Sequence, residues 1–99
     1  MKLFNPFQFM SHAKNATVLF GLKTEEIYIT NNMTAHNLIE DLRLVFGIPP
    51  QQPLFLRHRR SNTQFHGKCN IYRLLNDNDV IELDWATASD LTMMQNEIE

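Results

Sequence analysis

Apolar runs in the first part of the chain predict a β-hairpin. Residues 17–22 form a short apolar run rich in strand-forming side chains. Residues 26–30 alternate between polar and apolar side chains with a period of two, so that Ile27 and Ile29 share one face. The polar residues 23–25 between these runs indicate a turn, and we expect the two runs to pair as antiparallel strands.

A helix is predicted after the hairpin. Its apolar side chains recur on one face: Leu38, Ile39, Leu42, Val45 and Phe46. Thr34 is suited to cap the N-terminus, because its hydroxyl can accept a hydrogen bond from an early N–H group. Asn37 stands where a capping box favours Glu or Gln, so we expect no capping box. Gly47 can adopt the left-handed conformation that ends a helix, and Pro49 and Pro50 prevent its continuation.

The second half of the chain predicts more strands. Residues 54–57 read as a third strand, with Phe55 on the face opposite to its neighbours. The polar segment 58–70 is typical of a loop and carries a weak strand signal near Phe65. Residues 80–85 alternate as a final strand.

One helical turn at residues 71–75 completes the order of elements. The fold class that follows is α+β, with one helix packed across one face of a mixed four- to five-stranded sheet.

The order of elements and several segments resemble ubiquitin and its relatives. Thr34 and residues 47–50 (Gly-Ile-Pro-Pro) stand at the separation found between the capping Thr and the end of ubiquitin's helix. Residues 54–56 are similar to its Leu-Ile-Phe strand after one deletion, and residues 79–83 to the last strand of many ubiquitin-like domains. The resemblance covers residues 16–85 and implies the ubiquitin-like β-grasp fold.

The chain departs from the family in ways that bear on function. Modifiers and sulfur carriers of this fold end in Gly-Gly, whereas the last glycine here is Gly67. We therefore expect a ubiquitin-like protein that is not conjugated to others. Cys69 is the single cysteine, which excludes the four-cysteine iron–sulfur cluster of the ferredoxin branch and any intramolecular disulfide. A single cysteine favours a reducing compartment inside the cell.

The resemblance also implies a surface for partners. Ubiquitin recruits proteins through an apolar patch around the Ile of its Leu-Ile-Phe strand, and Phe55 stands at that position. Because Arg57, His58 and Arg59 follow it, we expect a basic and aromatic surface there. The neighbouring positions on the final strand are acidic here, so the family patch is not reproduced as a whole. The alternative is that Phe55 packs beneath the chain's own ends.

Both ends lie outside the predicted domain. Residues 1–15 are too apolar for a free tail, and residues 86–99 have the pattern of an amphipathic helix. We interpret both as docking elements for a partner. The side chains that we expect to dock are Phe4, Phe7, Phe9, Leu91, Met94 and Ile98.

Charge and chemistry narrow the function. Net charge is −2 and the pI is near 6.0, so neither nucleic acid nor an anionic membrane is indicated. No segment approaches the roughly 20 apolar residues that span a bilayer. The four histidines lack the spacing of metal ligands, and the serines lack the context of a nucleophile. We therefore expect no enzyme activity, no cofactor and no metal.

These observations favour a non-catalytic protein-interaction module. The first hypothesis is a small accessory or structural subunit of a larger protein assembly, inside the cell. The alternative is a free ubiquitin-like adaptor that binds receptors of the ubiquitin system through the Phe55 surface.

Overall fold

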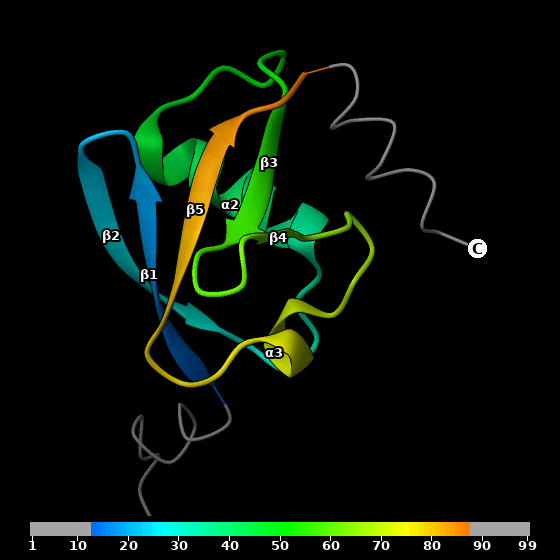
Figure 1. Ribbon diagram of the computed structural model, residues 1–99. Coiled ribbons are helices and arrows are strands. Elements are labelled where there is room, and N and C mark those ends of the chain that lie inside the picture. Colours follow the sequence, from blue (N-terminus) through cyan, green and yellow to red (C-terminus); the bar gives the residue numbers. More distant parts are fainter. Residues whose placement is uncertain (1–12, 88–99) are drawn as a thin grey trace, which may run out of the picture.

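The computed structural model describes residues 13–87, whose strands form a five-stranded mixed sheet (Figure 1). The strands are β1 (Lys14–Phe20), β2 (Lys23–Ile29), β3 (Leu54–His58), β4 (Thr63–Gln64) and β5 (Asp79–Trp85). Their order in the sheet is β2-β1-β5-β3-β4. The central strands β1 and β5 run parallel, and the other neighbours are antiparallel. This is the predicted α+β fold of the ubiquitin-like β-grasp type.

Two helices accompany the sheet within residues 13–87. Helix α2 (Ala35–Phe46) lies across one face of the sheet, and α3 (Ile71–Leu74) is the single turn predicted near residue 71 (Figure 1). The core lies between α2 and the sheet, because alternate residues of each strand point toward the helix. Its fully buried side chains include Val18, Leu42 and Ile81.

The hairpin is confirmed, but its turn lies earlier than expected. Phe20 pairs with Lys23, so only Gly21 and Leu22 stand between the strands. Gly21 has a φ of 61°, which glycine adopts without strain, and this permits a two-residue turn. The prediction of a turn at residues 23–25 was therefore wrong. Strand β1 begins at Lys14, within the segment assigned to the N-terminal docking element.

The helix ends as predicted and begins with an unexpected capping box. The Thr34 hydroxyl accepts a hydrogen bond from the Asn37 N–H, and the Asn37 Oδ1 accepts one from the Thr34 N–H, both at 3.1 Å. The expectation of no capping box was wrong, because an amide oxygen on the shorter Asn side chain still reaches the Thr34 N–H. Gly47, with a φ of 68°, ends the helix.

One prediction about the buried face of α2 was also wrong. Val45 is half-exposed, since it lies at the edge of the face defined by Leu38, Ile39 and Leu42. The six side chains predicted to dock from the two ends, Phe4, Phe7, Phe9, Leu91, Met94 and Ile98, lie outside the described residues. No helix among residues 13–87 is long and apolar enough to cross a membrane.

Candidate docking surface

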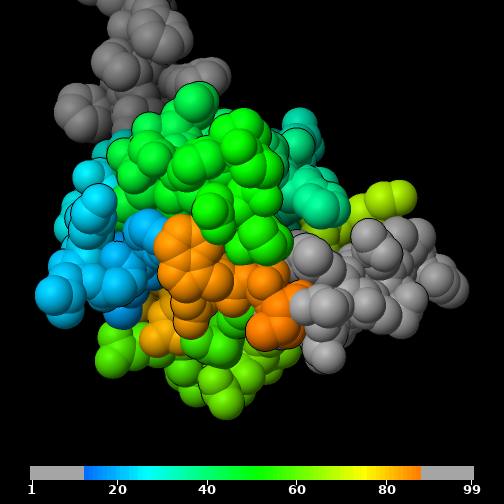
Figure 2. All heavy atoms as spheres, turned by 90° about the horizontal axis from the view of Figure 1, so that it is seen from above, coloured from blue at the N-terminus to red at the C-terminus, as the bar shows by residue number. Residues whose placement is uncertain are grey.

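Figure 2 looks onto the end of the molecule where β1, α2 and β5 all finish. Three aromatic side chains meet there, one from each of these elements. The ring centroid of Phe20 lies 5.2 Å from that of Phe46 and 5.4 Å from that of Trp85. The Phe20–Trp85 pair is edge-to-face. Such a pair adds about 0.5–1.5 kcal/mol to the stabilisation from burial alone. The cluster therefore ties the last turn of α2 to the two central strands.

Large apolar side chains are exposed on or next to the elements that carry this cluster. Leu22 in the β1–β2 turn is fully exposed, Leu44 in the last turn of α2 is 85% exposed, and Trp85 is 52% exposed. We call this region the apolar end and define it by its six side chains: Phe20, Leu22, Leu44, Val45, Phe46 and Trp85. Exposed apolar side chains gathered in one region are typical of a binding surface.

Sequence reasoning did not identify the apolar end as a surface. Trp85 was predicted only as part of the final strand, and its ring contacts Phe20 but keeps half of its surface exposed. Two local signals were available. Leu44 is an apolar residue on the polar side of the helical pattern, and Leu22 is an apolar residue inside a two-residue turn.

The structure does not show the exposed aromatic surface that we expected around Phe55. Phe55 is only 6% exposed, and the guanidinium carbon of Arg57 lies 5.2 Å from the centre of its ring. Arg57 also donates a hydrogen bond from Nε to the Glu82 Oε1 at 2.9 Å, and its Nη2 lies 3.8 Å from the Asp84 Oδ2. The expected exposed aromatic ring is thus replaced by an arginine paired with the acidic residues of β5.

His58 is also not at that surface. Strand alternation places it on the opposite face from Phe55 and Arg57, where it is 7% exposed. Arg59 has an exposed side chain, with its Nε 3.9 Å from the Glu82 Oε2. The structure therefore corrects the predicted surface for Phe55 and His58, and a binding role for any of these residues stays a prediction.

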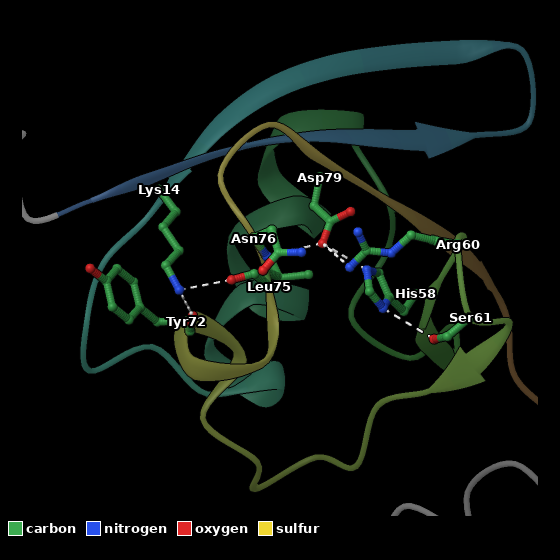
Figure 3. A network of polar contacts seen from close by, with 8 residues as sticks. All are labelled: Lys14, His58, Arg60, Ser61, Tyr72, Leu75, Asn76 and Asp79. Carbon is green, nitrogen blue, oxygen red and sulfur yellow. Dashed lines mark hydrogen bonds and ion pairs between the residues drawn. The ribbon is translucent and has the colours of Figure 1, made fainter.

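His58 instead belongs to a polar network that joins β3 to β5 (Figure 3). Its Nε2 lies 2.7 Å from the Asp79 Oδ2, and its Nδ1 lies 3.1 Å from the Ser61 Oγ. The same Asp79 oxygen accepts a hydrogen bond from the Asn76 N–H at 3.0 Å and lies 3.5 Å from the Arg60 Nη2. No sequence signal pointed to this network, because its members come from separate elements.

The surroundings of Asp79 keep its carboxylate ionised. Burial by itself raises the pKa of Asp79. The hydrogen bonds from the Asn76 N–H and from His58, together with the charges of His58 and Arg60, outweigh burial and lower that pKa below its ordinary value. The network is therefore built around a buried negative charge with several donors.

A second polar contact fixes α3. Lys14 donates hydrogen bonds from Nζ to the carbonyl oxygens of Tyr72 at 2.6 Å and Leu75 at 2.7 Å (Figure 3). The same Nζ lies 4.3 Å from the centre of the Tyr72 ring. One ammonium group thus donates to carbonyl oxygens at the end of a single-turn helix, which has no following turn whose N–H groups could bind them.

The described residues offer little for metal or thiol chemistry. Residues 13–87 contain no group of three His, Cys, Asp or Glu side chains that could hold a metal ion. Burial raises the pKa of the Cys69 thiol, even though hydrogen bonds with the backbone of His66 and Ala35 act in the opposite direction. A thiol with a raised pKa is a poor nucleophile at neutral pH.

Comparison with known proteins identifies the fold. No protein-family model and no curated protein sequence matches the chain. Among solved structures, a ubiquitin-like domain of an Arabidopsis thaliana protein matches with a TM-score of 0.64 and 15% identity, over 79% of this chain and 82% of that one. A chain of the toluene 4-monooxygenase HD complex matches with a TM-score of 0.60 and 17% identity, over 75% of this chain and 99% of that one.

A third match is the structure of ATBAG1 in complex with HSP70, with a TM-score of 0.64 and 16% identity. It covers 85% of this chain and 46% of that one. Since all these identities are low, the matches establish the fold alone. The described part of the chain has the ubiquitin-like β-grasp fold.

Proposed function

We propose that this chain is a non-catalytic protein-interaction module, an accessory subunit of a larger protein assembly, which docks through its apolar end. The observation that carries the proposal is the exposure of Leu22, Leu44 and Trp85 at the end of the molecule where β1, α2 and β5 finish. Full burial of a side chain such as leucine in an interface contributes about 1.5–3 kcal/mol. Tryptophan is among the residues most often found at the energetic centre of interfaces.

The comparisons support an assembled role. The matched chain of the toluene 4-monooxygenase HD complex is covered almost end to end, so a small chain of this fold exists there within a complex. ATBAG1 was likewise solved with a protein partner, HSP70. The partner in this proposal is a protein with a complementary apolar face, and the association is non-covalent. Nucleic acid and covalent conjugation play no part in it, and the assembly lies in a reducing compartment inside the cell.

The alternative function, a free adaptor of the ubiquitin system, depends on the Phe55 surface. No feature of residues 13–87 favours it, because the Phe55 ring is covered.

The test compares a variant at the apolar end with a matched variant elsewhere. Leu22→Ser combined with Leu44→Ser removes two exposed leucines without opening the core. Leu74→Ser is the control, because Leu74 is 52% exposed but belongs to α3. Tagged chains are purified from the source cells, and the proteins recovered are quantified by mass spectrometry.

We expect the double variant to lose a protein that Leu74→Ser retains. In the purified complex, hydrogen exchange should slow at residues 20–22 and 44–46. Equal recovery of every protein by both variants would contradict the proposal. Concentration-dependent dimerisation of the pure chain, abolished by the double variant, would instead make the apolar end a contact between two copies.

A further inference from the structure

A polar hollow lies on the face of the sheet opposite α2, over the first half of β1. Its volume is about 260 Å³. The residues that line it are Asn15, Ala16, Thr17, Glu26, Tyr28 and Asn78. It is separate from the apolar end, because Tyr28 lies five residues along β2 from Lys23, roughly 17 Å at about 3.4 Å per residue.

Backbone pairing holds the walls of the hollow in place. Asn15 pairs with Tyr28 and Thr17 with Glu26 across the β1–β2 ladder, so these four side chains stand side by side on one face. Asn78 closes the third side, and its N–H donates a hydrogen bond of 2.8 Å to the Asn15 carbonyl oxygen. The hollow is thus formed by rigid strands and one anchored turn.

The side chains in the hollow have hydrogen-bonding capacity left over. Within residues 13–87, the side chains of Glu26, Thr17 and Tyr28 form no hydrogen bond or ion pair. In the same sheet Glu82 is paired with Arg57 and Asp79 with His58. Glu26 therefore brings a negative charge to the hollow without a counter-ion from the described part of the chain.

We propose that the hollow binds the guanidinium group of an arginine side chain supplied by a partner protein. The Glu26 carboxylate accepts two parallel N–H donors, and the amide oxygens of Asn15 and Asn78 accept the remaining ones. The Tyr28 ring offers a face for stacking of the planar cation. This inference rests on the proposed role as an interaction module and adds a second, charged contact to the apolar one.

Arginine fits this arrangement better than lysine does. A guanidinium presents five N–H donors in a flat fork, whereas an ammonium is a compact point charge with three donors. The acceptors of the hollow are distributed on both strands and the turn, so they suit a flat group with donors on several sides.

The experiment uses the full chain labelled with nitrogen-15 and three small probes. These are N-acetyl-arginine amide, N-acetyl-lysine amide and N-acetyl-citrulline amide, which keeps the shape of arginine without its charge. Each probe is titrated while amide chemical shifts are recorded. We expect the arginine probe to shift the amides of residues 15–17, 26–28 and 78 at millimolar concentrations, more strongly than the lysine probe and much more than the citrulline probe.

Adjacent glutamates on β2 provide the matched variants. Glu26→Gln should weaken arginine binding about two- to fivefold, the range for an exposed ion pair. Glu25→Gln should leave it unchanged, because Glu25 neighbours Glu26 in the strand but does not line the hollow. Equal binding of citrulline, equal effects of both variants, or shifts located elsewhere would overturn the proposal. The titration does not involve the apolar end, so its failure is distinguishable from failure of the docking proposal.

Discussion

The imidazole Nε2 of His58 lies 2.7 Å from the Oδ2 of Asp79, and this contact joins the last residue of β3 to the first residue of β5. Both side chains are less than 10% exposed. Strands β3 and β5 are distant in sequence, so the pair fixes their relative position at the edge of the core. Hydrogen bonds between buried, partly charged groups are stabilising when every partner is satisfied.

We expect Asp79→Asn to destabilise the fold by about 1–3 kcal/mol at pH 7, because it removes the charge that His58 and Arg60 face. Stability should also depend on pH. The pKa of Asp79 is lowered in the folded state, so its contribution is fully present above the ordinary value of 3.8 and is lost as the pH falls through the lower folded-state pKa.

Urea unfolding of the unsubstituted protein and of Asp79→Asn between pH 2 and pH 7 measures the contribution of the Asp79 carboxylate to stability. The stability difference should shrink toward the acid end of the range. Asp41→Asn serves as the control, since Asp41 is exposed and forms no hydrogen bond or ion pair within residues 13–87. A difference that stays constant down to pH 2 would show that Asp79 is not stabilised as an anion.

The sequence was sufficient for the fold where the signals are local. The cap at Thr34, the stop at Gly47 and the period of the apolar positions predicted α2, and alternation predicted the strands. The parallel pairing of β1 and β5 joins residues more than 60 positions apart. No local pattern encodes that pairing, so only a mixed sheet was predicted and the pair of strands was not.

The candidate sites were less accessible from the sequence. Phe55 was expected at the surface because of its position in the resemblance, but Arg57, two residues later on the same face, lies over its ring. The His58–Asp79 contact and the exposure of Leu44 depend on how separate elements pack, which residue spacing does not specify. The docking residues expected in the two ends stay predictions.

Ser61, His58 and Asp79 are connected by hydrogen bonds in the order of a nucleophile, a base and a carboxylate. The proposal of a non-catalytic module therefore predicts that these three residues do not act as a catalytic triad. We expect hydrolysis of p-nitrophenyl acetate to be no faster than with an equal concentration of free imidazole. Ser61→Ala should leave that rate unchanged, because the Asp79 oxygen also serves Asn76 and Arg60 in a structural network. Saturable hydrolysis that Ser61→Ala abolishes would make the domain an esterase.

Lys14→Met should loosen α3 while leaving the sheet intact. Methionine keeps much of the apolar stem but loses both hydrogen bonds to the Tyr72 and Leu75 carbonyls and the contact with the Tyr72 ring. A hydrogen bond from a charged group contributes about 1.5–3 kcal/mol to stability.

Hydrogen exchange reports the change locally, and we expect faster exchange of the amides in residues 71–75. Lys68→Met is the matched control, because Lys68 is exposed and forms no hydrogen bond within the described part of the chain. If both variants exchange alike, Lys14 does not hold α3.

The capping box at the start of α2 predicts that substitutions at its two residues are energetically coupled. Thr34→Ala removes the acceptor for the Asn37 N–H, and Asn37→Ala removes the acceptor for the Thr34 N–H. Loss of the threonine cap should destabilise the domain by about 1 kcal/mol, and loss of the Asn37 side chain by less, because it leaves the cap itself in place. The two changes share one hydrogen-bonded unit, so the double variant should lose less stability than the sum of the single variants. Strict additivity in urea unfolding would mean that the two hydrogen bonds act independently and that the box is not a cooperative element.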